Sequence, residues 1–361
     1  MVRSVLVIPG LVGQPGESSA TIALPNLAPL AAESDVVPLA PETPEGLREA
    51  AWLGLNPAEH PVADGPLLVA GLGEKPPERA VCLVATWGTL GATLAEAPRM
   101  EPHEEAEASA AMRRLQTPRL FWLTGEQPHN ALVWLDGPIE FSTTPFDQAV
   151  GHEYQTQWPA GDGDQVLRQF IEDSHEVLSA LEFNQRRLDG GAPPVDVVWP
   201  WGQGWMPRMP NLALRYPPAT VHTDSLRVRG LCRLTGLTSK RALSRGFGDD
   251  WAFVKDLGPT SLVVIEAFAT LRRAGRAEEL GWLGKRLDTH LFDLFRPLPP
   301  SAGSHLVILS PSDTGPGLML ERSADSRGGT TPFDERALED AGRAGRTTWD
   351  VVARVMRSWT S

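Results

Sequence analysis

The chain has 361 residues, of which 42% are hydrophobic and 22% are charged. This length and composition fit one large α/β domain with an insertion, or two domains, and they argue against wholesale disorder. The formal net charge of −12 disfavours a general nucleic-acid-binding protein, because contacts to phosphates need basic surfaces.

The amino-terminal segment predicts a core strand. Its apolar run at residues 4–8 ends at Pro9 and Gly10, and this run is too short for a signal peptide or a membrane span. The two cysteines, Cys82 and Cys232, lie far apart in apolar surroundings. We expect them to be buried thiols of a reducing compartment and not a disulfide or a metal pair. These features favour a cytoplasmic protein that does not enter a membrane.

Strand-like and helical patterns alternate along much of the chain. Apolar runs predict strands at 4–8, 67–70, 80–85, 195–199, 261–265 and 305–309. Helical periodicity occurs at 25–33, 44–54, 164–183, 224–236, 268–297 and 333–357. Such alternation favours an α/β fold with a mostly parallel sheet that helices cover on both faces.

The segment from about residue 100 to 187 has a different pattern. It opens with the acidic helix former EPHEEAEASAAMRRL and continues with the alternating stretches LFWLTG and ALVWLDG. These stretches predict a smaller α+β domain with its own hairpins. We therefore expect residues 1–100 and 188–361 to form the α/β core, and residues 101–187 to form an inserted, lid-like domain.

Several collinear motifs resemble one known family. They are PNLAPLA at 25–31, LGLNP at 53–57, GPLLVAGLG at 65–73 and WPWGQG at 199–204, the last preceded by Asn184, Arg187 and Gly190. In this order they resemble the archaeal-type 2,3-bisphosphoglycerate-independent phosphoglycerate mutases, a branch of the alkaline phosphatase superfamily. The resemblance covers nearly the whole chain outside residues 100–160, and it implies an alkaline-phosphatase-like core.

The resemblance also implies a chemistry. In this family, two divalent metal ions held by Asp and His at strand ends assist transfer of a phosphoryl group through a serine, and 3-phosphoglycerate and 2-phosphoglycerate interconvert. Matched to the family pattern, the serine position here holds Glu45. The metal-ligand positions hold Pro9, Ala269, Arg273, Pro311, Ser312 and Arg322. Because such ions need carboxylate or imidazole ligands, we expect no metal cofactor and assign no catalytic residue.

The histidines do not restore a metal motif. None of the eight histidines stands in a spacing typical of metal ligands. The stretch VHTDS, with His222 and Asp224, comes nearest, and the start of a helix explains it better.

Arginines offer a way to bind an anion, because a guanidinium group binds phosphate with two hydrogen bonds. Arg227, Arg229, Arg233, Lys240, Arg241 and Arg245 cluster in the sequence. The candidate anion-binding residues are Arg229, Arg233, Arg187 and Arg273. A solvated basic surface is the alternative interpretation.

The tryptophan-rich loop of Trp201, Gly202, Gln203 and Gly204 is predicted to lie near the family's site. Together with Trp205, its aromatic rings would stack on a ligand or a partner, or else pack in the core.

Three functional hypotheses remain open at this stage. The first is a diverged mutase-like pseudoenzyme with a binding or regulatory role, which keeps an anion pocket for a phosphorylated small molecule or binds an unknown protein. The second is an active mutase or phosphatase in which Glu42, Glu45, Glu266 or Asp313 takes an unfamiliar role. The third is a protein-interaction module that uses the tryptophan-rich loop.

Overall fold

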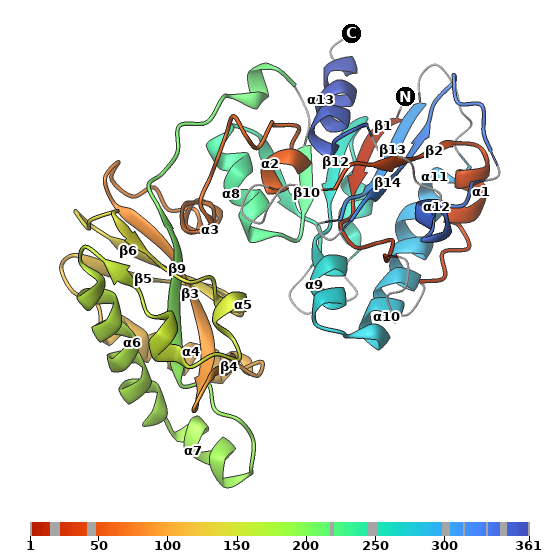
Figure 1. The fold of residues 1–361 in the computed structure, drawn as a ribbon. Helices are drawn as coiled ribbons and strands as arrows, with labels where there is room; N and C mark the ends of the chain where they lie inside the picture. The colour runs from red at the N-terminus through yellow and green to blue at the C-terminus, as the bar shows by residue number, and fades with distance from the viewer. Residues whose placement is uncertain are drawn as a thin grey trace. The chain divides into compact units, whose positions relative to one another are not determined.

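The computed structural model describes residues 2–14, 22–41, 48–216, 220–243, 251–297, 304–312, 315–329, 331–339 and 345–359. The chain divides into two compact units (Figure 1). The first unit combines Met1–Pro61 with Met209–Ser361, and the second is Val62–Arg208.

The described residues of the first unit form a seven-stranded sheet in the order β11-β10-β12-β1-β13-β14-β2. The strands are β1 (Val2–Val7), β2 (Asp35–Leu39), β10 (Thr220–Thr223), β11 (Thr238–Arg241), β12 (Thr260–Val264), β13 (Ser304–Ser310) and β14 (Gly317–Arg322). The strands from β11 to β13 run parallel, and β14 runs antiparallel to both β13 and β2. The sheet is therefore mostly parallel, as the sequence predicts.

Helices cover both faces of this sheet (Figure 1). They are α1 (Leu27–Ala32), α2 (Arg48–Trp52), α8 (Leu226–Leu234), α9 (Ala267–Arg273), α10 (Ala277–Leu287), α11 (Asp293–Phe295), α12 (Arg336–Glu339) and α13 (Thr348–Ser358). This unit also contains the 3₁₀-helices η2 (Leu212–Leu214) and η3 (Ala252–Asp256) and the π-helix η4 (Asp288–Phe292). Leu6 and Ile8 pack in one core cluster with Phe268, while Val5 and Val7, which alternate with them, are also fully buried. Burial on both faces explains why these strands are continuous apolar runs.

The second unit is built around an antiparallel sheet. Strands β3 (Val81–Leu90), β4 (Leu94–Glu96), β5 (Leu120–Glu126) and β6 (His129–Trp134) follow the order β4-β3-β6-β5, and β9 (Val197–Gly204) also pairs with β3. A short pair joins β7 (Phe141–Ser142) to β8 (Ala160–Gly161). The helices are α3 (Asp64–Leu72), α4 (Pro102–Arg114), α5 (Phe146–Ala149), η1 (Tyr154–Gln157), α6 (Asp164–Ser179) and α7 (Glu182–Asp189).

The second unit is wider than the insertion expected at residues 101–187. The predicted strands at 80–85 and 195–199 exist as parts of β3 and β9, but these two strands pair with each other in the antiparallel sheet. The sequence pattern predicts instead that both strands belong to the mostly parallel sheet of the core. A buried strand carries the same apolar pattern in either sheet, so the sequence does not reveal its partner.

The expected strand at 67–70 is wrong, because these residues lie in α3. This helix is buried along most of its length, and a Cβ on Gly65 would lie 2.2 Å from the carbonyl oxygen of Cys82 in β3. A helix that packs so closely on a sheet is apolar on every side. Periodicity alone cannot distinguish such a helix from a buried strand.

Two other expectations can be compared with the structure. Cys82 and Cys232 are buried free thiols, as predicted, and burial raises the pKa of Cys82 to about 12. Among the described residues, none of the helices combines the length and the apolar character that crossing a bilayer requires.

Candidate functional site

The candidate site lies at the carboxyl-terminal edge of the parallel sheet. Adjacent parallel strands end at the same edge, and ligands of open α/β sheets bind there. Pro9 follows β1, Asp224 follows β10, Glu266 follows β12 and Pro311 follows β13. Because β10, β12, β1 and β13 are neighbours in this order, these four positions lie at the same edge of the sheet.

The loops after β1 and β13 contact each other directly. The backbone N–H of Val12 donates to Oγ of Ser310 at 2.9 Å, and Nε2 of Gln14 donates to the carbonyl of Pro316 at 3.2 Å. These contacts join the loop that carries Pro9 to the loop that carries Pro311 and Ser312. Two of the strand ends predicted to have lost metal ligands are thus held together by hydrogen bonds within the chain.

The loop after β1 also packs against α9. Gly10 has a φ of +75°, and a Cβ at this position would lie 2.8 Å from Cα of Ala269. Nε of Arg272 donates to the carbonyl of Gly10 at 2.5 Å, and its Nη2 donates to that of Leu11 at 3.3 Å. The backbone therefore approaches Ala269 closely, which only a glycine permits here.

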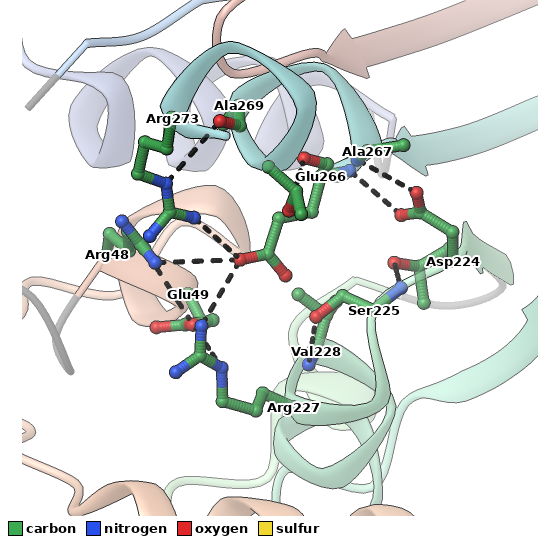
Figure 2. Close-up of polar contacts among 12 residues, drawn as sticks. Arg48, Glu49, Asp224, Ser225, Arg227, Val228, Glu266, Ala267, Ala269 and Arg273 are labelled. Carbon is green, nitrogen blue, oxygen red and sulfur yellow. Dashed lines mark hydrogen bonds and ion pairs between the residues drawn. The ribbon is translucent and has the colours of Figure 1, made fainter. Parts of the chain in front are cut away.

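A group of charged and polar side chains, here termed the ionic cluster, lies where β10 and β12 end (Figure 2). Its members come from α2, from the start of α8 with the loop before it, and from α9 with the residue before it. They are Arg48, Glu49, Asp224, Ser225, Arg227, Glu266 and Arg273.

Three guanidinium groups point toward one carboxylate oxygen (Figure 2). Oε1 of Glu266 lies 3.2 Å from Nη2 of Arg227, 3.6 Å from Nη2 of Arg48 and 3.9 Å from Nη2 of Arg273. Nε of Arg227 also lies 3.0 Å from Oε1 of Glu49. Arg227 therefore bridges the two glutamates.

Burial differs across the ionic cluster. The side chains of Arg48 and Glu49 are 5% and 1% exposed, whereas that of Arg273 is 46% exposed. Burial tends to raise the pKa of Glu266, but Arg227 and Arg48 outweigh it and hold this pKa at about 2. Glu266 is therefore an ionised carboxylate held by arginines.

Asp224 joins the loop after β10 to the start of α9. Its carboxylate accepts hydrogen bonds from the backbone N–H groups of Glu266 at 2.8 Å and Ala267 at 3.0 Å. Burial, with a smaller contribution from the charge of Glu266, raises the pKa of Asp224 to about 7. Next to it, Ser225 caps α8, since its Oγ accepts from the backbone N–H of Val228 at 3.3 Å.

The ionic cluster does not fit a divalent metal centre. A guanidinium group has no lone pair to give to a metal ion, and it competes for the carboxylates that do. In the part of the chain that the structure describes, no three His, Cys, Asp or Glu side chains form a group that could hold a metal ion. Glu42, Glu45 and Asp313 lie outside the described residues.

Arg322, predicted at a metal-ligand position, does not belong to the site. It lies on β14 opposite Leu306, near the start of β13, whereas Pro311 follows the end of β13. There it donates to the carbonyl of Phe295 at 3.2 Å and pairs with Glu33. The prediction is wrong because β14 runs antiparallel and carries Arg322 to the other edge of the sheet.

Of the candidate anion-binding arginines, Arg273 joins the ionic cluster. Arg233 is exposed in the last turn of α8, about 9 Å along the helix from Arg227. Arg229 lies two positions after Arg227 and therefore on a different side of this helix. In the second unit, Nη2 of Arg187 contacts Oε2 of Glu104 at 2.6 Å. This ion pair ties α7 to the first turn of α4.

The loop residues Trp201 to Gly204 have structural contacts within the second unit. Trp201 is buried, and its indole N–H donates to Oγ1 of Thr86 at 2.8 Å. The amide of Gln203 accepts from Thr143 and donates to the carbonyl of Phe141. A Cβ on Gly202 or Gly204 would meet Asp64 or Ala63, so both glycines allow α3 to pack closely. These contacts favour the core interpretation, although Trp205 is 50% exposed.

Sequence reasoning missed Arg48 and Glu49 as site residues. A weak signal exists, because they form a charged pair within the otherwise apolar stretch LREAAWLGL at 47–55. Charged residues at apolar helix positions indicate buried ion pairs.

Comparison with known proteins supports the relationship that the motifs predict. The chain is 27% identical over 160 residues to a probable 2,3-bisphosphoglycerate-independent phosphoglycerate mutase of Geobacter sulfurreducens, which is 44% of this chain and 40% of that protein. It is 32% identical over 68 residues to such a mutase of Methanothrix thermoacetophila, which is 19% of this chain and 17% of that protein. Homologues are thus named as cofactor-independent mutases, and the matches span less than half of their lengths. No protein-family model matches the chain.

Solved structures share the fold. A protein from Pyrococcus horikoshii aligns with a TM-score of 0.69 at 15% identity, covering 98% of this chain and 97% of that one. The cofactor-independent phosphoglycerate mutase of Thermoplasma acidophilum aligns with a TM-score of 0.55 at 18% identity, covering 99% and 100%. The chain therefore shares its fold with these two proteins, and the mostly parallel α/β sheet is as predicted.

Proposed function

We propose that this protein is a phosphoglycerate-mutase-like pseudoenzyme that lacks metal-dependent phosphoryl transfer and has a binding or regulatory role. The mutase-named homologues support the relationship. The observation that supports a loss of activity is the contact of Arg227 and Arg48 with Glu266 at the strand ends. This contact supports the proposal that guanidinium groups take the place of the metal ions that the resemblance implies.

The chemistry of the ionic cluster supports this proposal. Arginines can stabilise a transferring phosphoryl group, but the transfer also needs an activated nucleophile. Ser225 is a hydroxyl within the cluster, and it hydrogen-bonds to Glu266. Because the pKa of Glu266 is about 2, this carboxylate is a very weak base near neutral pH. It is therefore poorly suited to activate Ser225.

The same argument disfavours Glu266 in the second hypothesis, an enzyme with substituted catalytic residues. A carboxylate that contacts three guanidinium groups is not available as a metal ligand. If this protein showed the mutase activity that its relatives are named for, the proposal would be contradicted.

Metal content and turnover test the proposal directly. The protein is purified without a chelator, its metals are measured by mass spectrometry, and conversion of 3-phosphoglycerate to 2-phosphoglycerate is assayed with added Mn²⁺ or Mg²⁺. We expect no stoichiometric metal and no turnover above background. An active cofactor-independent mutase, assayed in parallel, is the positive control. Two tightly held ions per chain, or turnover that Glu45→Ala abolishes, would overturn the proposal.

A further inference from the structure

One buried histidine lacks the hydrogen bonds that ring nitrogens normally make. His222 on β10 is fully buried, and neither its Nδ1 nor its Nε2 has a hydrogen-bond partner in the part of the chain that the structure describes. Its ring lies against that of Phe253 in η3, with the two ring centroids 5.8 Å apart. Buried polar groups without partners are rare in folded proteins. This position favours the neutral ring, because a buried cation would have neither water nor a hydrogen-bond acceptor.

Two charged side chains of opposite sign act on this ring. Lys240 is paired with His222 in the register of β10 and β11, and Asp256 belongs to η3. Nζ of Lys240 lies 3.5 Å from Oδ2 of Asp256, and the two side chains are 52% and 61% exposed. On β12, the residue paired with His222 is the uncharged Val263. The two charges oppose each other, so burial has the largest effect and lowers the pKa of His222 below its ordinary value of 6.5.

The other titratable residues on the surrounding elements make different contacts. Arg241 of β11 donates to a backbone carbonyl, and Lys255 of η3 is exposed. His290 of η4 stacks on Trp251, with ring centroids 5.7 Å apart. Asp224, two residues after His222, accepts hydrogen bonds from the backbone at the start of α9. Lys240 and Asp256 are therefore the charges to consider in the titration of His222.

η3 covers the ring of His222 with little buried surface of its own. It is a 3₁₀-helix of five residues, and Phe253 is its buried residue. Its ion pair, between Asp256 and Lys240 of β11, lies at the protein surface. Surface ion pairs contribute little to stability, and short segments with few buried contacts open at a low cost in free energy. Among the elements beside His222, η3 is therefore the one that can most easily move away.

We propose that His222 is a pH-sensitive switch, which keeps η3 on the sheet while its ring is neutral and releases η3 when the ring takes up a proton from water. Displacement of Phe253 exposes the imidazolium ring to solvent. The carboxylate of Asp256 is close enough to the ring to serve as its counter-ion. The switch responds in the mildly acidic range, where an accessible histidine titrates. It needs neither a metal ion nor a substrate, so this inference does not depend on the proposed function.

Amide hydrogen exchange, followed by mass spectrometry, tests this proposal. Exchange is compared at about pH 7.5 and pH 5.5, after correction for the intrinsic effect of pH on exchange rates. In the wild-type protein we expect the protection of residues 252–257 to be about tenfold lower at the acidic pH, because an accessible histidine is then mostly protonated. Strand β1, in the same unit, should keep its protection. In His222→Leu, the protection of residues 252–257 should be equal at both pH values.

His103→Gln is the matched control. His103 is exposed on α4 in the second unit, so its loss should leave the wild-type response of η3 unchanged. Circular dichroism checks that each variant is folded.

Two exposed positions decide the matter should His222→Leu fail to fold. Asp256→Asn removes the negative charge near the ring, and the fall in protection should then move to lower pH. Lys240→Gln removes the positive charge, and the fall should move to higher pH. We expect each shift to be roughly a few tenths of a pH unit, because both side chains are largely exposed. Both variants lose the same ion pair, so opposite directions identify an effect of charge on His222.

Several results would overturn the inference. They are equal protection of η3 at both pH values in the wild-type protein, an equal fall in the wild-type protein and His222→Leu, and shifts in the same direction in Asp256→Asn and Lys240→Gln. A loss of protection that includes β1 to the same extent would also overturn it, because the whole sheet would then unfold. Retention of metal ions or mutase turnover would contradict the proposed function and leave this inference intact.

Discussion

Nη2 of Arg227 donates to Oε1 of Glu266 at 3.2 Å, although the two residues stand 39 positions apart in the sequence. The contact exists because β10 and β12 are parallel neighbours. Each of these strands delivers the start of its following helix to the same edge of the sheet. A shared edge of this kind is where the fold assembles charges from separate helices.

Arg227 should contribute strongly to stability. Replacement by methionine keeps the apolar stem but removes the partner that lies 3.0 Å from the buried carboxylate of Glu49. We expect Arg227→Met to lower the free energy of unfolding by about 3 kcal/mol, as when one partner of a buried ion pair is removed. Urea unfolding at pH 7 measures the change. The exposed Arg276 supplies the control, because Arg276→Met should cost less than about 1 kcal/mol. Similar losses in both variants would contradict the prediction.

Asp224 should make the protein less stable as the pH rises. Its pKa is raised from an ordinary value of 3.8 to about 7 by burial, so the folded state holds this proton more tightly than the unfolded state. The resulting stability is fully present below the ordinary pKa and is lost as the pH rises through about 7. In Asp224→Asn this contribution should disappear, on the order of 2 to 4 kcal/mol across the interval. Chemical denaturation from pH 4.5 to 8.5, a range of roughly four units, checks this. If the unfolding free energies of the wild-type protein and Asp224→Asn changed with pH in the same way, the prediction would be contradicted.

His222 should destabilise the folded protein at acidic pH. It lies fully buried on β10 beside Phe253, and neither ring nitrogen has a hydrogen-bond partner among the described residues. Burial, with the nearby charge of Lys240, lowers the pKa of His222 below its ordinary value of 6.5. The unfolded state therefore takes up a proton more readily, and stability present above pH 6.5 is lost as the pH falls.

Replacement of His222 by leucine tests this. At pH 7.5 we expect His222→Leu to be within about 1 kcal/mol of the wild-type protein, because no hydrogen bond in the described part of the chain is lost. Toward pH 5 the variant should become the more stable of the two. Denaturation midpoints across this range measure the difference, and exposed His103, changed to Gln, is the control. A difference that does not grow as the pH falls would show that His222 is not responsible.

Gly65 should not tolerate a side chain. A Cβ there would lie 2.2 Å from the carbonyl oxygen of Cys82 and 2.8 Å from that of Gly202. Because both obstacles are backbone atoms, α3 would have to move away from β3 and β9. We expect Gly65→Ala to cost about 3 kcal/mol or more of stability. At Gly91, in the same unit, the nearest atom to a Cβ is 3.8 Å away. Gly91→Ala should therefore stay within about 1 kcal/mol, and thermal unfolding of both variants compares them.

Much of the fold follows from local sequence pattern. β1, β12 and β13 are predictable because a strand buried on both faces is a continuous apolar run. The helices α6 and α8 are predictable from their periodicity. Local pattern fails at residues 67–70, because a helix buried on every side also lacks polar positions.

The site is predictable only in part. Pro9, Ala269 and Pro311 belong to one edge because parallel strands with intervening helices end on the same side. Sequence reasoning puts Arg322 at the wrong edge of the sheet. The antiparallel direction of β14 follows from its pairing with β13, which local sequence pattern does not reveal. The pairing of β3 with β9 is likewise a long-range contact.

By itself, the sequence determined which segments become buried strands and helices, since those depend on residues that are neighbours along the chain. It also determined the residue types at the strand ends. The tertiary structure alone decided that Arg48, Arg227 and Arg273 converge on Glu266. Ion pairs act through space over a few ångströms, and only the folded sheet brings α2, α8 and α9 within that distance.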